Sequence, residues 1–152
     1  IAIIGVLATI VLVSLNSARV KARNVSRLAS IDVLVKAFNL SRVNLLPEAG
    51  RDIWACVSVT CYGGWLDVAR NATVDAFLAP SLSATPSDPT GGSRGSGGFL
   101  YINPTLHFNV YVSPRFKDGA YLYWKMEPGG SCGQGTILSI SALEVDCFLY
   151  ID

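Results

Sequence analysis

A run of apolar side chains opens the chain. The first 15 residues carry no charge, and only Gly5, Thr9 and Ser14 interrupt the hydrophobic positions. A helix over this run is apolar on every side, whereas a helix at the surface of a soluble domain is apolar along one stripe. At about 1.5 Å per residue the run covers about 22 Å, less than the roughly 30 Å of a bilayer's hydrocarbon core. We therefore expect a membrane helix or a helix buried in a bundle, with its apolar segment beginning upstream of Ile1.

Two other interpretations of this run are less consistent with the residues. A secretory signal peptide has a basic start and a cleavage site of small residues, and neither is visible here. A core helix of one small domain is rarely apolar all round for four turns. The helix-forming sequence also continues directly past Leu15.

The helical pattern continues through residues 16–46, which contain neither Pro nor Gly. One face is apolar at steps of three and four, with Val25, Leu28, Ile31, Val35 and Phe38, and a different face carries Arg19, Arg23, Arg27 and Ser30. Pro47 predicts the end of the helix at Leu46. A helix of 46 residues is about 69 Å long, which exceeds the diameter of a domain of this size. We therefore expect residues 1–27 to project from a head formed by residues 28–152.

The head is predicted to combine the second half of the helix with an antiparallel sheet. Residues 47–98 have little regular pattern, with short elements near 53–59 and 66–78 and a turn-rich loop over 80–98. Four runs rich in β-branched and aromatic residues follow, at 99–103, 106–112, 120–126 and 136–145. Because the connections are short, consecutive strands should pair antiparallel. The fold class is therefore α+β, with a small sheet of three or four strands over 99–152 covering the helix.

Composition and charge narrow the function classes. The chain has 152 residues, of which 51% are hydrophobic and 15% charged, whereas soluble domains carry about 25% charged residues. A disordered charged tail is therefore excluded, and the length fits one domain. The net charge is +1, with seven basic and two acidic residues over 16–51 and five basic and nine acidic residues after them. There is no overall basic field, so no specific nucleic acid is expected as a partner.

The opening phrase IAIIGVLATIVLVSLNSARVKAR resembles the N-terminal helix of bacterial type IV pilins and of the pseudopilins of type II secretion systems. The resemblance is specific over residues 1–28. In that family a short basic leader is removed before a start of the Phe-Thr-Leu-Ile-Glu-Leu type, and the new N-terminus is methylated. Here that start would lie upstream of Ile1, so N-terminal methylation cannot be placed on any position of this sequence. The resemblance also implies a pilin-like head.

This resemblance implies a structural subunit that polymerises through its N-terminal helix into an extracellular filament like a type IV pilus. The helix would lie in the inner membrane before assembly and in the filament core afterwards, and the head would coat the outside at the cell surface. The implied partners are further copies of the chain and the pilus or secretion assembly machinery. The expected polymerisation core consists of Ile1, Ile3, Ile4, Gly5, Leu7, Ala8, Val11, Leu12 and Leu15.

Two alternative functions stay open. The chain could be a pseudopilin that forms a short fibre in a type II secretion or DNA-uptake machine. A function of another class is a membrane-tethered extracellular binding module that never polymerises. Purified filaments composed mainly of this chain would favour the pilus subunit. A head that stays monomeric on membranes would favour the binding module.

Four cysteines, Cys56, Cys61, Cys132 and Cys147, predict two disulfides in a chain with an export-type anchor. Three pairings exist, and proximity in the sequence favours Cys56–Cys61 with Cys132–Cys147. The second pair also resembles the C-terminal disulfide loop of many pilins. Zinc is disfavoured because the spacing lacks paired CxxC motifs.

Other candidate chemistry is sparse, and we expect no enzymatic activity, no cofactor and no metal. His107 is the only histidine, and no nucleophile motif such as GxSxG occurs, so no catalytic triad can be assembled from known signatures. Asp88 and Asp118 have too few neighbouring carboxylates to indicate calcium. Nothing in the sequence supports a carboxylate pair of Glu127 with Glu144.

Three Asn-x-Ser/Thr triplets are acceptor patterns for glycosylation, starting at Asn24, Asn39 and Asn71. Two of them lie on the long helix, where a structural role is expected. Asn71 is therefore the candidate for modification.

Overall fold

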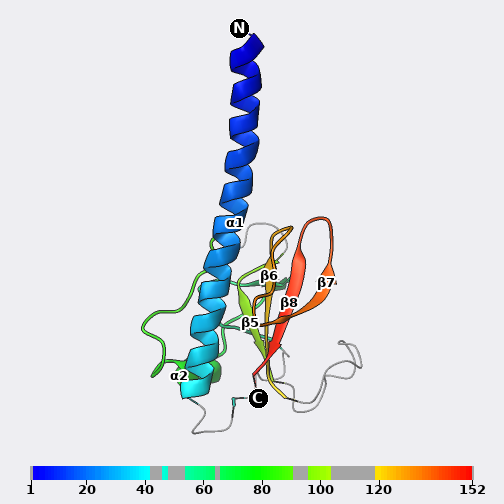
Figure 1. Ribbon diagram of the computed structural model, residues 1–152. Helices are drawn as coiled ribbons and strands as arrows, with labels where there is room; N and C mark the ends of the chain where they lie inside the picture. The colour runs from blue at the N-terminus through cyan, green and yellow to red at the C-terminus, as the bar shows by residue number, and fades with distance from the viewer. Residues whose placement is uncertain are drawn as a thin grey trace.

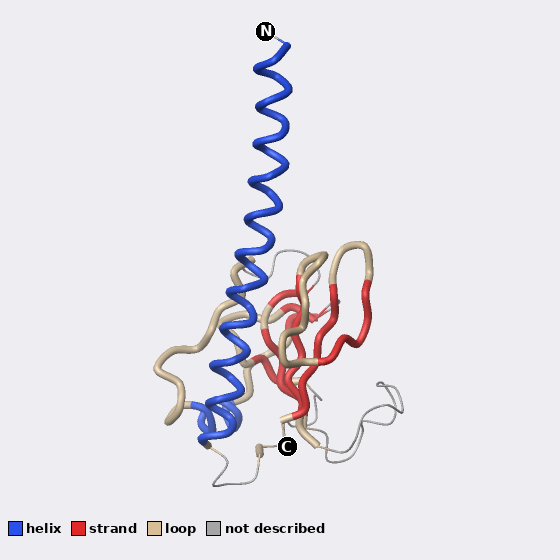
Figure 2. The backbone as a smooth tube through the Cα atoms, viewed as in Figure 1, coloured by secondary structure: helices blue, strands red, loops and turns tan. Residues whose placement is uncertain are grey.

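A computed structural model describes residues 2–41, 46–47, 54–63, 66–90, 96–103 and 119–151, with the side chains of the first helix described from Ile10 onward. That helix, α1, spans Ala2–Leu40. With 39 residues it is about 58 Å long. Its N-terminal half projects beyond the head, and its C-terminal half lies along one side of the head (Figure 1). The backbone trace in Figure 2 shows the same shape, with the C-terminus at the opposite end of the molecule from the N-terminus.

The predicted end of the helix at Leu46 is wrong, because α1 ends at Leu40. The amide of Ser41 still donates to the carbonyl of Ala37 at 3.0 Å, and Ser41 lies in a turn. Beyond the turn, the carbonyl of Pro47 accepts from the Tyr101 hydroxyl at 2.7 Å, and Asn103 donates to the carbonyl of Leu46 at 3.1 Å. Tyr101 and Asn103 thus hold the backbone at Leu46 and Pro47, and Pro47 lies seven residues after the last residue of the helix.

The main sheet has five strands among the described residues, and all of its pairings are antiparallel. Its order is β1-β5-β6-β8-β7, with β1 at Ala55–Cys56, β5 at Phe99–Ile102, β6 at Tyr121–Met126, β8 at Val145–Tyr150 and β7 at Thr136–Ile140. A smaller sheet has the order β3-β2-β4, with β3 at Leu66–Asp67, β2 at Tyr62–Gly63 and β4 at Ser96–Gly97. The predicted α+β class, with a long helix and an antiparallel sheet, is confirmed.

The prediction of a single strand over 136–145 is wrong, because the chain turns within this segment and forms a hairpin. β7 ends at Ile140 and β8 begins at Val145. The turn between them is closed by Ser141, whose hydroxyl accepts from the amides of Leu143 at 3.2 Å and Glu144 at 3.0 Å. β8 inserts between β6 and β7, so these two consecutive strands do not pair. The strand expected over 106–112 lies outside the described residues.

The second half of the short element predicted over 66–78 is a helix. α2 spans Ala72–Leu78. The side chain of Asn71 caps it by accepting from the amides of Thr73 at 2.9 Å and Val74 at 3.2 Å. Val74 and Leu78 are buried, so the helix is held by its apolar side.

The core lies between α1 and one face of the main sheet. Ile31, Leu34 and Phe38 of α1 are at most 1% exposed. Phe38 stacks on Tyr101 of β5, with ring centroids 4.9 Å apart. The apolar face predicted for this part of the helix is correct except for Val25, which is 66% exposed. The position facing the head there belongs to Asn24, which is buried.

Two disulfides hold the head, and they join the pairs favoured by sequence proximity, Cys56–Cys61 and Cys132–Cys147. All four cysteines are at most 5% exposed. The second bond ties β8, which contains Cys147, to the loop before β7, which contains Cys132. Cys147 also lies opposite Trp124 of β6. It therefore fixes the C-terminal half of the sheet as one unit.

Replacing Cys132 and Cys147 together by Ala is expected to lower the free energy of unfolding by about 3 kcal/mol, and the same change at Cys56 and Cys61 by about 2 kcal/mol. The difference follows from the sequence separations, 15 and 5 residues, since a longer closed loop restricts the unfolded chain more. Urea unfolding of the full chain in mild detergent measures both values. A larger loss from the shorter loop would contradict this account.

Candidate functional site: an exposed apolar helix and the polar cluster at its base

The projecting part of α1 presents apolar side chains to its surroundings on all sides. Ile10, Val11, Leu12 and Val13 are 60%, 63%, 65% and 72% exposed. Successive residues of an α-helix are about 100° apart, so these four surround the helix completely. Leu15 follows at 45% exposure. A single flat partner covers one stripe only, so burial of this segment requires an environment that encloses it.

The predicted polymerisation core coincides with this segment where side chains are described. Val11, Leu12 and Leu15 are exposed, as a contact surface must be. Ile1 lies outside the described residues, as do the side chains of Ile3, Ile4, Gly5, Leu7 and Ala8, whose backbone belongs to α1. No helix within the described residues has both the length and the apolar character that crossing a membrane requires.

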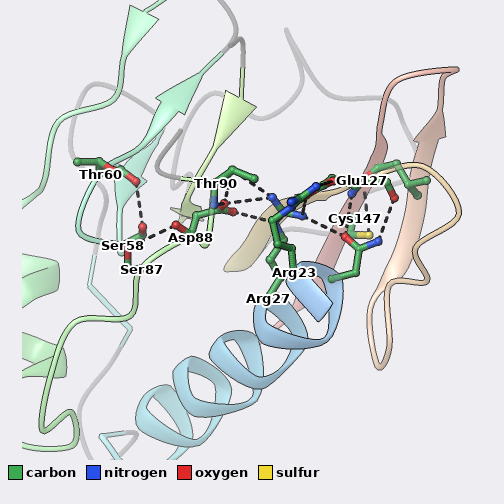
Figure 3. A network of polar contacts seen from close by, with 11 residues as sticks. Arg23, Arg27, Ser58, Thr60, Ser87, Asp88, Thr90, Glu127 and Cys147 are labelled. Carbon is green, nitrogen blue, oxygen red and sulfur yellow. Dashed lines mark hydrogen bonds and ion pairs between the residues drawn. The ribbon is translucent and has the colours of Figure 1, made fainter. Parts of the chain in front are cut away.

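A buried ion pair lies where the projecting segment meets the head. Arg27 of α1 binds both carboxylate oxygens of Asp88, from Nε at 2.9 Å and from Nη2 at 3.1 Å (Figure 3). Arg27 is 4% exposed and Asp88 5%. Thr90 supports the carboxylate, since its amide donates to Asp88 at 2.9 Å and its hydroxyl at 2.6 Å. The pair therefore joins α1 to the loop after α2.

Glu127, which follows β6, binds the same turn of α1. Its two carboxylate oxygens accept from Arg23 at 2.5 Å each, and one also accepts from Arg27 at 3.1 Å. Asn24 binds the backbone of Glu127 in both directions, accepting from its amide at 2.9 Å and donating to its carbonyl at 3.2 Å. The helix is thus bound to the loop and to the sheet within one turn. We call Arg23, Asn24, Arg27, Asp88, Thr90 and Glu127 the base cluster.

The base cluster favours the charged forms of its two acids. Burial by itself raises the pKa of Asp88, but the hydrogen bonds from Arg27 and Thr90 outweigh it and hold that pKa below its ordinary value of 3.8. Hydrogen bonding from Arg23 lowers the pKa of Glu127 below 4.5, against a smaller opposing effect of burial and with further help from Arg27. Both carboxylates therefore stay ionised at neutral pH.

No sequence pattern predicts the base cluster. The helical spacing places Arg23 and Arg27 on a separate face without indicating a partner, and the sequence around Asp88 suggested calcium as its only candidate ligand. In the structure the guanidinium of Arg27 occupies the position beside Asp88 that a cation would need. The available signal was a helix with several basic residues and almost no acids on it. That pattern indicates partners elsewhere in the chain but does not identify them.

Among the described residues, Glu127 and Glu144 do not form a carboxylate pair. Glu144 pairs with Lys125 at 2.5 Å and Glu127 with the arginines, so the two acids have separate partners. No group of metal-binding side chains occurs among the described residues. His107 and Asp118 lie outside that part of the chain. Asn71 caps α2, and its modification stays a prediction.

One cavity of about 310 Å³ lies beside α2, between Val57, Leu78 and Leu82. Arg70 and Asp75 at its wall already bind one another at 2.7 Å in a partly exposed ion pair. The lining therefore mixes apolar side chains with Ser83, Thr85 and a neutralised charge pair, and it does not indicate a particular ligand.

Comparisons with known proteins add no relative: no model of a protein family matches the chain, and no curated protein or solved structure matches it either.

Replacing Asp88 by Ala is expected to lower the free energy of unfolding by about 3 kcal/mol, because it leaves the buried guanidinium of Arg27 without its main partner. The matched control is Asp75→Ala, which breaks the exposed pair with Arg70 and should cost about 1 kcal/mol or less. Denaturant unfolding measures both. Equal losses would show that the burial of Arg27 has no energetic consequence.

The base cluster also predicts acid sensitivity. Because the pKa values of Asp88 and Glu127 are lowered by folding, their contribution to stability is complete above the unfolded values and is lost as the pH falls through the lower folded values. Unfolding free energies measured between pH 6 and about pH 2.5 should therefore decrease below about pH 4. Glu127→Gln keeps a hydrogen-bond acceptor without the titration and should reduce this decrease. An unchanged pH dependence in this variant would contradict the assignment.

Proposed function

We propose that this chain is the structural subunit of a helical, extracellular filament of the type IV pilus kind, which it forms by packing its projecting helix against those of other copies. The observation that carries the proposal is the helix segment from Ile10 to Leu15, which is exposed and apolar all round while covalently and rigidly attached to a folded head. Such a segment needs an enclosing environment, and a bundle of identical helices provides one.

The segment needs an enclosing environment at every stage, because each Val, Leu or Ile side chain gains about 1.5–3 kcal/mol when it is transferred from water to an apolar surrounding. Lipid encloses the segment before assembly and neighbouring helices enclose it afterwards, so association of the helices rests on close packing between them. Every copy carries the same segment, so each copy can enclose the next. In such a bundle, one side of a helix contacts a different side of the helix of the next copy. Contacts of this kind build an open filament when the rotation from one copy to the next does not close a ring.

The head is suited to the outside of such a filament. It is held by two buried disulfides, which persist in oxidising surroundings outside the cytoplasm. The base cluster fixes the angle and axial position at which the helix leaves the head. A regular helical polymer requires a fixed geometry between the projecting helix and the head. The proposed location is the cell surface, with the inner membrane holding the unassembled subunit.

A charge placed on the projecting segment tests the proposal. Val11→Asp should abolish filaments, because an aspartate enclosed by apolar helices would be desolvated without a partner, while the head stays folded. Val59→Asp is the matched control, since Val59 is 52% exposed on the head, and it should assemble normally. Electron microscopy and sedimentation of the assembled full-length chain give the readout. Normal filaments from Val11→Asp would refute the packing proposed here.

A further inference from the structure

A second exposed apolar surface lies on the β7–β8 hairpin. β7 is the outermost strand of the main sheet within the described part of the chain, and all five of its residues are exposed. The largest exposures are at the turn, with Ile140 at 70% and Leu143 at 82%. The disulfide, the core and the base cluster use neither side chain. We call Ile140 and Leu143 the hairpin tip.

Strand register places the hairpin tip at the end of the head from which α1 projects. Met126 of β6 lies opposite Val145 of β8, and Val145 lies opposite Ile140 of β7. The next residue after Met126 is Glu127, which binds Arg23 of α1. The turn at 141–144 extends past this row of strand residues, and Figures 1 and 2 show it at the same end of the head as the projecting helix.

The same end of the molecule carries positive charge. Arg19 and Lys21 are exposed on α1 between the apolar segment and the head. The chain has no acidic residue before Asp32, and the one acid of the hairpin turn, Glu144, is paired with Lys125. The hairpin tip and these two basic side chains therefore lie around the point where the helix leaves the head.

We propose that this end of the head lies on an anionic phospholipid bilayer in the unassembled subunit, with Arg19 and Lys21 at the lipid phosphates and the hairpin tip in the interface. The inference deepens the proposed function, because it rests on insertion of the projecting helix into a membrane before assembly. Basic residues beside a membrane-inserted segment are attracted to anionic headgroups, and exposed apolar side chains add binding through their burial.

Charge distinguishes this occupant from a second copy of the same surface. Two such ends facing one another would bring four cationic side chains together, which is unfavourable. Lipid phosphates complement them instead. A hairpin tip seated on lipid would also limit rotation of the head about the inserted helix, since the head would have two separate points of contact.

The experiment places a fluorescent reporter at the hairpin tip of the full-length chain. Leu143→Trp is reconstituted at low protein density in vesicles of phosphatidylglycerol and phosphatidylcholine with brominated acyl chains. The matched probe is Leu40→Trp, which replaces a leucine that is 71% exposed at the far end of α1. We expect the added fluorescence to be lost at position 143 and kept at position 40. Arg19→Gln with Lys21→Gln, or vesicles of phosphatidylcholine alone, should weaken the loss.

Several results would overturn the inference. One is unquenched fluorescence at position 143 while vesicle flotation shows the chain bound. Another is equal quenching at positions 143 and 40. Quenching that is the same in neutral vesicles would refute the role of anionic lipid, and protection of position 143 only in filaments would assign the hairpin tip to a neighbouring copy. Filament formation by the unmodified chain is measured without vesicles, so failure of the proposed function is detected separately.

Discussion

The burial of the Arg27 charge is the constraint on which the arrangement of helix and head depends. A guanidinium removed from water is costly unless its hydrogen bonds are satisfied. Here Asp88 accepts from Nε and Nη2 of Arg27, and Glu127, Asn24 and Thr90 also accept from its N–H groups. Apolar packing is non-directional and would tolerate small rotations of the helix. The bidentate pair does not, so it selects one rotation and one axial position of α1 on the sheet.

One continuous helix therefore has two different environments. From Asn24 to Phe38 its inward side is covered by the head, and the buried residues follow helical spacing. From Ile10 to Leu15 the same helix has apolar side chains that the chain itself leaves exposed. The base cluster lies at the boundary between these two parts. It holds the covered part of the helix on the head, so the exposed apolar part projects in a fixed direction. Heads attached in this way can be arranged regularly around a bundle of the projecting helices.

The sheet extends this geometry to the side of the helix. Glu127 connects the end of β6 to Arg23, and the neighbouring β8 and β7 carry the turn at 141–144 to the same end of the head. The hairpin is kept in place by the Cys132–Cys147 disulfide and by the hydrogen bonds of Ser141. The surface around the exit of the helix is thus built from rigid elements, which is a requirement for a defined contact with any flat partner.

Local patterns in the sequence determined the long helix, the exposed apolar segment, the strands β5 and β6 and the choice of nearby cysteine partners, because each depends on neighbouring residues. Tertiary structure alone decided the rest. Helix α1 ends at Leu40, and hydrogen bonds from Tyr101 and Asn103 hold the carbonyls of Pro47 and Leu46. Arg27 pairs with Asp88, which lies 61 residues later in the sequence, and no sequence periodicity predicts such a pairing. The turn at Ser141 has no sequence signal, because residues 141–144 contain neither Gly nor Pro, and only the pairing of β7 with β8 defines the hairpin.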